Sequence, residues 1–381
     1  MTKFRYISLI AALTICSLTS ALPQNQKGAK IWSAGFGPSR DVKIRNPKFV
    51  WQVWPEGESK ITSAIFVING KVFEATYDAK KKEMYCDLLD SLPAGTYDVL
   101  AKIKVDNWAS FDKKWSVTIR PDAIQNGSDA SADSKLAVNE YNVIRAQHGF
   151  APCKLDSFLN LAAAAHTNYL SLNREGGHAE EPGKPGFTGS EPKDRMNLFG
   201  HVGASWEVVS MGGRDPIEGI RGLWDAPYHR INMMMPGPGI VGASFKDDFF
   251  TMDGEGSTID GIFVSPPNGG KGISPSWRNQ EIPDPTRDFP DAETVLGYPV
   301  VLNVYGDGIT ALSILDSKFT SDEGSDIGRY ELCSANDDHL RNSVILIPKK
   351  PLKANTSYAV TLRLKDNLGT IHQKAWTFRT K

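Results

Sequence analysis

The chain has 381 residues, with 43 Lys and Arg against 44 Asp and Glu, and a formal net charge of −1. Its 40% hydrophobic and 23% charged residues exclude a long disordered or collagen-like chain, and the length predicts two or three globular domains. The balanced charge removes the main electrostatic argument for a nucleic-acid partner. No apolar run reaches the roughly 18–20 residues that a membrane span needs, so no transmembrane segment is expected.

Residues 1–21 have the pattern of a secretory signal peptide. Lys3 and Arg5 precede an apolar stretch at 6–16 that is too short to cross a bilayer. Small residues at 19–21 then suit cleavage before Leu22. A buried first element and a lipid anchor at Cys16 stay open as alternatives. We therefore expect a secreted, extracellular or periplasmic protein.

Three cysteines remain after such cleavage: Cys86, Cys153 and Cys333. Their odd number and wide spacing do not fit a small disulfide-stapled domain, and no Cys-x-x-Cys pair predicts a cysteine zinc site. Two of the three could pair between domains, which would leave the third as a thiol. The domains are therefore expected to be held together by apolar cores.

Residues 30–120 are predicted to form an immunoglobulin-like β domain, because short apolar runs alternate with turns and no helix pattern interrupts them. The strongest local signal is Asn69-Gly70 between the runs 64–68 and 72–77, since both turn residues must accept a positive φ. A small-polar linker at 121–134 follows.

The middle segment, 135–256, mixes helix and strand. Leu136, Val143 and Ile144, with Tyr141 nearby, share a helical spacing, and a second helix is expected from Asp156-Ser157, which are good N-cap residues. A third helix is expected after Asp215-Pro216, since Pro favours the first helical position, and 240–252 has the pattern of a strand.

Residues 262–381 are predicted to form a second immunoglobulin-like β domain. Both β domains have a turn, a Tyr that opens a strand and, 18 residues later, a Trp that opens the closing strand: Tyr97 with Trp115, and Tyr358 with Trp376. The expected fold class is therefore α+β, with an α/β middle domain flanked by two all-β sandwiches.

The candidate site lies between His178 and His229. Glu207 sits in the apolar run 205–209, and a carboxylate there needs a partner because burying it bare is costly. Two imidazoles and one carboxylate could bind a divalent ion such as zinc with an open coordination position. They could equally form a neutral hydrogen-bonded cluster that ties loops to the core. His166, on the apolar face of its helix, is expected to be structural.

Four segments of the middle domain occur in a characteristic order: 177–182 (Gly-His-Ala-Glu-Glu-Pro), 185–189 (Pro-Gly-Phe-Thr-Gly), Asp194-Arg195, and 224–230 (Trp-Asp-Ala-Pro-Tyr-His-Arg). Together they resemble the bacterial branch of the CAP superfamily of cysteine-rich secretory, antigen 5 and pathogenesis-related proteins, also called the SCP domain. The resemblance covers about 120 of the 381 residues. It implies an α-β-α sandwich with a central cleft.

The resemblance also implies which residues line that cleft. In the family two His and two acidic residues do so, and His178, Glu207 and His229 match three of them, with Tyr228 beside the last. The second acidic residue usually follows the Trp by three positions, where this chain has Pro227. Three acidic residues of this chain are candidates to replace it: Glu180, Glu218 and Asp225.

Other motifs are absent or fail in context. Gly237-x-Gly239-x-x-Gly242 contains Pro238 and leads into a strand, so it does not predict a nucleotide site. Neither a Gly-x-Ser-x-Gly elbow nor a His-Glu-x-x-His zinc motif is found in the sequence.

Three functions remain open. The first is a binding module whose cleft, with or without a divalent ion at His178, Glu207 and His229, holds an extracellular lipid, peptide or protein. The second is a metal-assisted or Ser/His/Glu hydrolase, similar to a peptidase, with Glu207 or His229 as the weak catalytic candidates. The third is a structural cell-surface protein with a vestigial cleft. Fold alone does not decide among them.

Overall fold

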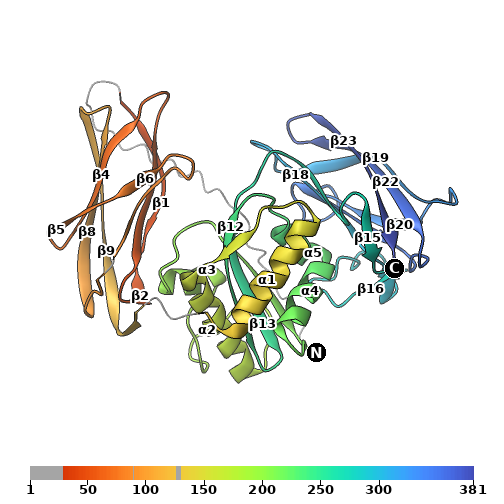
Figure 1. Cartoon of the computed structure of the whole chain (residues 1–381), viewed down its shortest axis with the longest axis horizontal. Helices are drawn as coiled ribbons and strands as arrows, with labels where there is room; N and C mark the ends of the chain where they lie inside the picture. The colour runs from red at the N-terminus through yellow and green to blue at the C-terminus, as the bar shows by residue number, and fades with distance from the viewer. Residues whose placement is uncertain (1–28, 89, 126–129) are drawn as a thin grey trace.

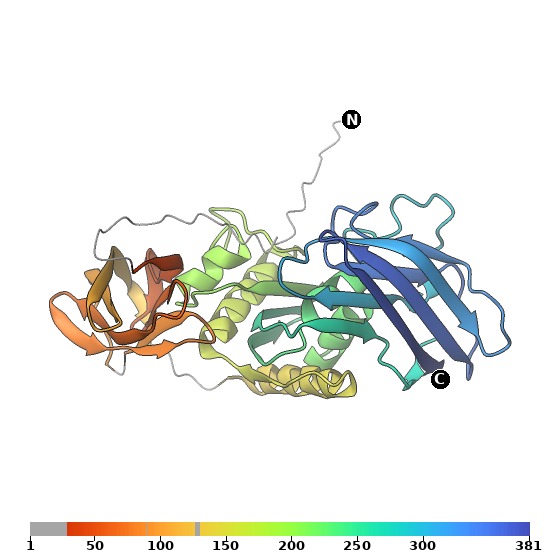
Figure 2. The same ribbon diagram turned by 90° about the horizontal axis from the view of Figure 1, so that it is seen from above.

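The structure is a computed structural model that describes residues 29–88, 90–125 and 130–381. The predicted signal peptide, with Cys16, lies outside these residues. Figures 1 and 2 show three parts in chain order: a β domain, a mixed α/β domain in the middle, and a second β domain. Within the described ranges, no helix is both long and apolar enough to cross a membrane.

The N-terminal part is a β sandwich, as predicted, made of a four-stranded and a five-stranded sheet. The Asn69-Gly70 turn joins two of its strands as expected, and both residues have a positive φ. The first sheet has the order β1 (Ile31–Gly37), β3 (Lys48–Pro55), β7 (Glu83–Asp87) and β6 (Thr76–Asp78). The second has the order β2 (Asp41–Ile44), β9 (Ala109–Ile124), β8 (Gly95–Val105), β4 (Ile61–Ile68) and β5 (Lys71–Glu74).

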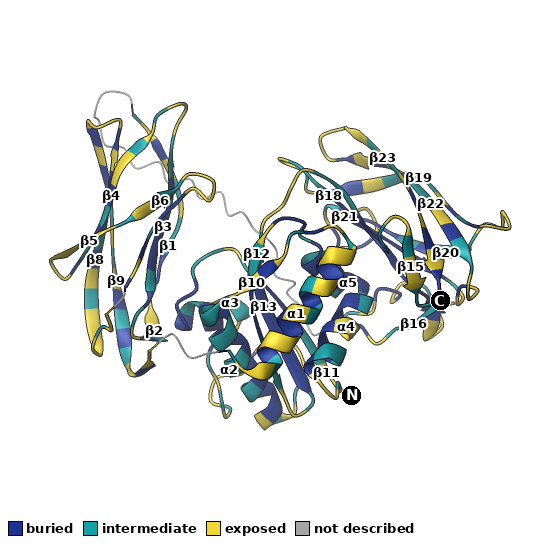
Figure 3. Cartoon of the chain, viewed as in Figure 1, coloured by how far each residue is buried: buried dark blue, intermediate teal, exposed yellow. Residues whose placement is uncertain are grey.

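The middle part is an α-β-α sandwich. Its sheet has the order β10 (Cys153–Leu155), β12 (Gly239–Lys246), β13 (Phe249–Gly256) and β11 (Trp206–Met211). One face is covered by α2 (Ser157–Asn173), which α3 (Pro192–Leu198) contacts. The other face is covered by α1 (Ala132–Gln147) and α4 (Pro216–Asp225), and α5 (Pro227–Met233) follows α4. Figure 3 shows the sheet strands as the most buried part of this domain.

The helix starts follow the predicted local chemistry. The side chains of Asp156 and Asp215 accept hydrogen bonds from the first turns of α2 and α4, which satisfies backbone N–H groups that have no partner within the helix. The strand expected at 240–252 is instead two strands, because a turn at Asp247, with φ of 56°, lets β12 and β13 pair as a hairpin. Gly242 is needed there, since a Cβ would lie 2.0 Å from the backbone nitrogen of Asn160 in α2.

The C-terminal part is the second predicted β sandwich. One sheet contains β14 (Gly261–Ser265), β18 (Val300–Tyr305), β21 (Ser343–Pro348) and β20 (Arg329–Leu332). The other contains β15 (Gly270–Ile273), β23 (Ile371–Thr380), β22 (Ser357–Asp366) and β19 (Leu312–Ser321). A short pair, β16 (Ser276–Arg278) with β17 (Val295–Gly297), lies between β15 and β18 in the chain. The three cysteines predicted to remain after cleavage are buried thiols, each in a different domain.

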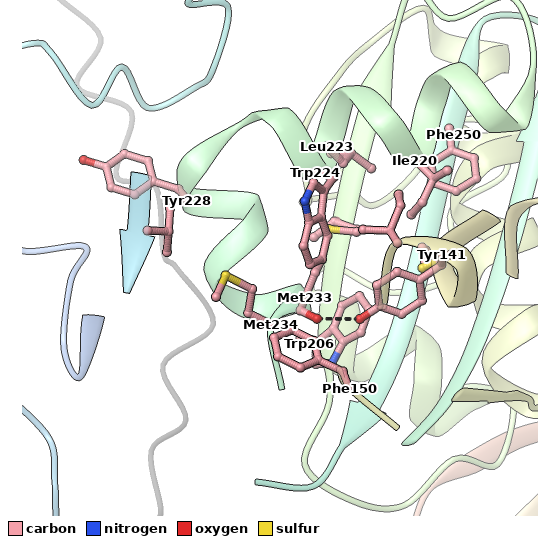
Figure 4. Packing of buried hydrophobic residues seen from close by; sticks show 14 of the residues in the cluster. Tyr141, Phe150, Trp206, Ile220, Leu223, Trp224, Tyr228, Met233, Met234 and Phe250 are labelled. Atoms are coloured by element: carbon pink, nitrogen blue, oxygen red, sulfur yellow. Dashed lines mark hydrogen bonds between the residues drawn. The ribbon is translucent and has the colours of Figure 1, made fainter. Parts of the chain in front are cut away.

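The middle and C-terminal domains share one apolar core. A single cluster of buried side chains joins α1, α4, α5 and the middle sheet to residues of the last domain. Figure 4 shows the middle-domain side of it, where the Tyr141 hydroxyl donates a 2.7 Å hydrogen bond to the carbonyl of Met233. The members from the last domain are Trp277, Leu296, Val301, Tyr330, Leu332, Leu340, Ile345 and Ile347. The boundary with the N-terminal domain is smaller, with Ile44 packed beside Leu159 and Met196.

Candidate functional site

Glu207 lies on the α2 face of the middle sheet. It is the second residue of β11, and its partner across the ladder is Asp253 of β13, so the two side chains share a face. His166 of α2 packs on that same face, with its Nε2 3.8 Å from Glu207 Oε1. Strand pairing and one helix therefore bring together three polar residues that are far apart in the sequence.

His178 and Glu207 form a direct pair, and they are two of the three residues predicted to meet. His178 Nδ1 is 2.8 Å from Glu207 Oε1. The Glu207 side chain is 1% exposed and that of His178 is 41% exposed, so the imidazole is the solvent-facing member. Arg195 of α3 fixes the carboxylate from behind, because its Nη2 donates to both Glu207 oxygens at 2.9 and 2.7 Å and also to the carbonyl of His178 at 2.8 Å.

His166 and Glu180 extend the network inward. His166 Nδ1 is 2.9 Å from Glu180 Oε1, and its Nε2 is 3.0 Å from the carbonyl of Gly177. Both ring nitrogens thus face acceptors, an arrangement that the imidazolium form satisfies by donating twice. Glu180 also accepts from the backbone amides of Thr188 and Gly189 at 2.6 and 3.2 Å, which fixes the loop before α3.

The charges of this network balance. Burial alone would raise the pKa of Glu207, but the charges of His166 and Arg195 and the His178 hydrogen bond outweigh it and hold that pKa well below its usual range. Burial, and then the charge of Glu207, raise the pKa of Asp253 well above its usual range. The side chain of Asp253 is buried, and neither oxygen receives a hydrogen bond from any described residue. A protonated Asp253 that donates to Glu207 accounts for both facts.

His229 does not join this network, which corrects the expected grouping. Its Nδ1 is 2.8 Å from Oε1 of Glu281, and the same oxygen accepts from the backbone amide of His229 at 3.0 Å. Glu281 belongs to the segment that leads into the last domain, and its side chain is fully buried. The helix α5 therefore presents His229 to the neighbouring domain.

Tyr228 is engaged at the same boundary and does not line an open cleft. Its hydroxyl donates to Asp337 and accepts from Arg287 Nη1 at 2.7 Å. Burial and the Asp337 contact raise the pKa of Tyr228. Arg230 donates to the carbonyl of Pro299 at 2.8 Å, so Tyr228, His229 and Arg230 all bond to the last domain.

The residues do not fit the predicted metal centre. Among the side chains of residues 29–88, 90–125 and 130–381, no three His, Cys, Asp or Glu groups are placed to hold a metal ion together. The physical reason is that Glu281 holds His229, while Arg195 already occupies both oxygens of Glu207. No step of the proposed function is therefore assigned to zinc or another divalent ion.

The candidate substitutes for the second acidic residue have separate places. Glu180 lies inside the network, Asp225 accepts a 2.7 Å hydrogen bond from the Tyr298 hydroxyl, and Glu218 pairs with the exposed Arg214. The sequence analysis missed the role of Asp253. An acidic residue directly after the run Phe249-Phe250-Thr251-Met252 was the available signal, since a buried acid needs a partner.

Comparison with known proteins identifies the middle domain. Residues 138–248 match the model of the cysteine-rich secretory protein family, CAP. The chain therefore carries a CAP domain, which confirms the family resemblance, and this domain lies between two β sandwiches. No match was found among the curated proteins.

Several solved structures are similar at low levels. An extracellular protein containing an SCP domain from Bacillus anthracis str. Ames has 11% identity and a TM-score of 0.29, covering 62% of this chain and 67% of that one. CopC from Methylosinus trichosporium OB3b has 18% identity and a TM-score of 0.19, covering 23% and 93%. SGBP-B from Bacteroides ovatus has 11% identity and a TM-score of 0.18, covering 96% and 69%. These values are too low to support any statement about the function of this chain.

Proposed function

We propose that the CAP domain is a binding module that holds an extracellular ligand at His178. The observation that carries this proposal is the contrast within one hydrogen-bonded pair, in which a half-exposed imidazole is fixed by a fully buried carboxylate. Arg195 and His166 hold that carboxylate in turn, so the orientation of His178 is set before any ligand arrives. Such preorganisation lowers the cost of ordering on binding.

The pair determines which ligand groups are recognised. When His178 Nδ1 donates to Glu207, the neutral ring presents the Nε2 lone pair as an acceptor. A ligand hydroxyl or amine can then donate to Nε2. We propose this contact as the centre of recognition, because burial of the rest of the network leaves His178 as its exposed member.

We also infer that the protein is exported. The basic start at Lys3 and Arg5, the short apolar stretch and the small residues at 19–21 support cleavage before Leu22. Mass spectrometry of the protein recovered from its source would test this inference. A mature N-terminus at Leu22 supports export, whereas an intact Met1 in a cytoplasmic fraction contradicts it.

A hydrolase is the second candidate, and the same 2.8 Å contact favours it. A carboxylate bonded to Nδ1 orients an imidazole as a general base, and the base could activate a water molecule through Nε2. Glu207→Gln distinguishes the two functions. It should abolish any turnover of ester or peptide substrates while the fold persists, whereas an absence of turnover in the unaltered protein excludes this candidate.

The binding proposal is tested by ligand-observed NMR. A panel of small hydroxyl- and amine-bearing compounds is screened against the protein, against His178→Ala and against His372→Ala. His372 is a matched control, because its Nε2 is 2.8 Å from Asp366 Oδ2 in the last domain. We expect compounds whose affinity falls about tenfold in His178→Ala, which corresponds to one lost hydrogen bond, and is unchanged in the control. If no compound distinguishes the two variants, the proposal fails.

A further inference from the structure

A hollow lies where the N-terminal domain meets the CAP domain. Its volume is about 540 Å³, within the range of small-molecule sites, and both domains contribute to its wall. The N-terminal domain supplies Arg40 and Asp41 at the start of β2, and the CAP domain supplies the loop 187–190 and one side of α3. Figure 1 shows β2 and α3 on facing sides of this junction, and the two elements are in contact.

The lining combines one aromatic ring with polar side chains that make no hydrogen bond or ion pair with other described residues. Phe187 is 38% exposed at the hollow. Among the described residues, no hydrogen bond or ion pair engages the side chains of Asp41, Ser190 or Asn197, all of which line the hollow. Convergent polar groups beside an apolar surface are typical of a site that fixes the orientation of a ligand.

The wall on the CAP side is rigid. Glu180 accepts from the amides of Thr188 and Gly189, and Arg195 Nη1 donates to the carbonyl of Gly189 at 3.2 Å. The loop that carries Phe187 is therefore fixed by the buried network behind it. A ligand in the hollow would meet a preformed surface, which reduces the entropy lost on binding.

The charges of the lining indicate the class of ligand. Arg40 lies 3.6 Å from Asp194, so these two charges offset one another, and Asp41 leaves one carboxylate in excess. This balance disfavours polyanions. The amide and hydroxyl groups both donate and accept, the carboxylate accepts, and the negative face of the Phe187 ring attracts C–H groups. A sugar ring has hydroxyls that do both, together with an apolar C–H face.

We propose that this junction is a saccharide-binding site. The sugar face packs on Phe187, and its hydroxyls bond to Asn197, Ser190 and Asp41. The site is separate from His178 and does not depend on the ligand proposed there.

The test is a glycan array probed with the purified protein, with Phe187→Ala and Asn197→Ala, and with Trp108→Ala as the matched control. Trp108 is an exposed aromatic residue, 46% accessible, in the turn between β8 and β9 and outside the hollow. We expect at least one glycan to be captured. Its affinity should fall about tenfold in Phe187→Ala, the scale of one lost ring contact, and about fivefold in Asn197→Ala.

The proposal is overturned by capture of no glycan by the unaltered protein, or by capture that neither Phe187→Ala nor Asn197→Ala weakens. An equal loss in Trp108→Ala would also place binding elsewhere. His178→Ala separates this site from the first one, since it should leave glycan capture unchanged. Unfolding curves of each variant confirm that the fold is retained, because Phe187 and Asn197 are not buried.

Discussion

The CAP domain contains two histidines that are each bonded at 2.8 Å to a buried glutamate, and the two pairs are used differently. His178 is 41% exposed, and its partner Glu207 is fixed from within the domain by Arg195. His229 is 16% exposed, and its partner Glu281 comes from outside the domain. The same pair of side chains thus presents an imidazole to ligands in one place and attaches a neighbouring domain in the other.

The largest expected effect is that of removing the cation that supports the first pair. Arg195→Met leaves Glu207 and Glu180 buried without that charge and should lower the free energy of unfolding by about 3–5 kcal/mol. Urea denaturation measures it. Arg40→Met is the control, since the Arg40 side chain is 78% exposed and its ion pair should contribute less than about 1 kcal/mol. Equal losses in the two variants would contradict a network built on Arg195.

The second pair should respond to loss of its histidine. His229→Ala removes the side-chain donor to Glu281 Oε1, and Glu281 Oε2 already lacks a partner among the described residues. We expect a loss of about 1–3 kcal/mol, because the carboxylate stays buried with one donor fewer. Adding Glu281→Ala to this variant should recover part of the loss. A double variant that is less stable than His229→Ala would show that the pair is not what attaches the domains.

The substitution Asp253→Asn is expected to have a smaller effect than the two above, and to raise the free energy of unfolding instead of lowering it. Because the folded pKa of Asp253 is raised, the folded state holds a proton that the unfolded state releases above about pH 4, so stability falls as pH rises. Asp253→Asn needs no such proton and keeps a donor toward Glu207. It should therefore be more stable than the unaltered protein by at least about 1 kcal/mol at pH 7, with the difference vanishing near pH 4.

Denaturation at several pH values measures this difference, and the exposed Asp260→Asn serves as the control with a difference near zero. If the stability of Asp253→Asn relative to the unaltered protein is lower at pH 7 than at pH 4, Asp253 is ionised in the folded protein. The charge balance of the network would then need another cation.

His178→Ala should have the smallest effect on stability, below about 1 kcal/mol, because water can replace a half-exposed imidazole and Arg195 still holds Glu207. His166→Ala is the informative comparison, since that ring is fully buried between Glu180 and Gly177. It should cost more than His178→Ala in the same urea titration. The reverse order would mean that His178 is a structural residue.

Zinc titration tests the separation of the two His–Glu pairs by metal binding and does not depend on a change in stability. Since His178 and His229 are in separate pairs, calorimetry at pH 7 should show no tight zinc site that His178→Ala removes. A site lost in both His178→Ala and His229→Ala would contradict the separation of the two pairs.

Much of the fold could be predicted from local chemistry. The caps at Asp156 and Asp215 and the turn at Asn69-Gly70 depend on neighbouring residues, and these predictions are confirmed. Tyr97 and Tyr358 lie near strand starts as predicted, but Trp115 and Trp376 lie in the middle of β9 and β23 and do not open them, because each closing strand begins at the preceding turn. The hairpin of β12 and β13 was missed, because Asp247-Asp248 is a weaker turn signal than Asn-Gly.

The site was only half predictable, for a physical reason. His178 and Glu207 meet within one domain, so the order of motifs indicated their proximity. The partners of Tyr228 and His229 are Asp337 and Glu281, which follow them by 109 and 52 positions. Nothing local to the sequence at 224–230 shows that another domain will cover it. Asp253 became recognisable when the register of β11 and β13 was known.

The apolar core shared by the CAP domain and the last sandwich has a consequence for how the protein is made and how it can be shortened. Val301, Ile345 and Ile347 are synthesised roughly 50–100 residues after the last strand of the CAP sheet, yet they belong to the same core as Tyr141 and Trp206. The CAP domain thus completes its packing late in synthesis. A segment cut at 256 would expose that surface, so the smallest part of the chain that keeps the CAP core complete runs from α1 to the C-terminal strand.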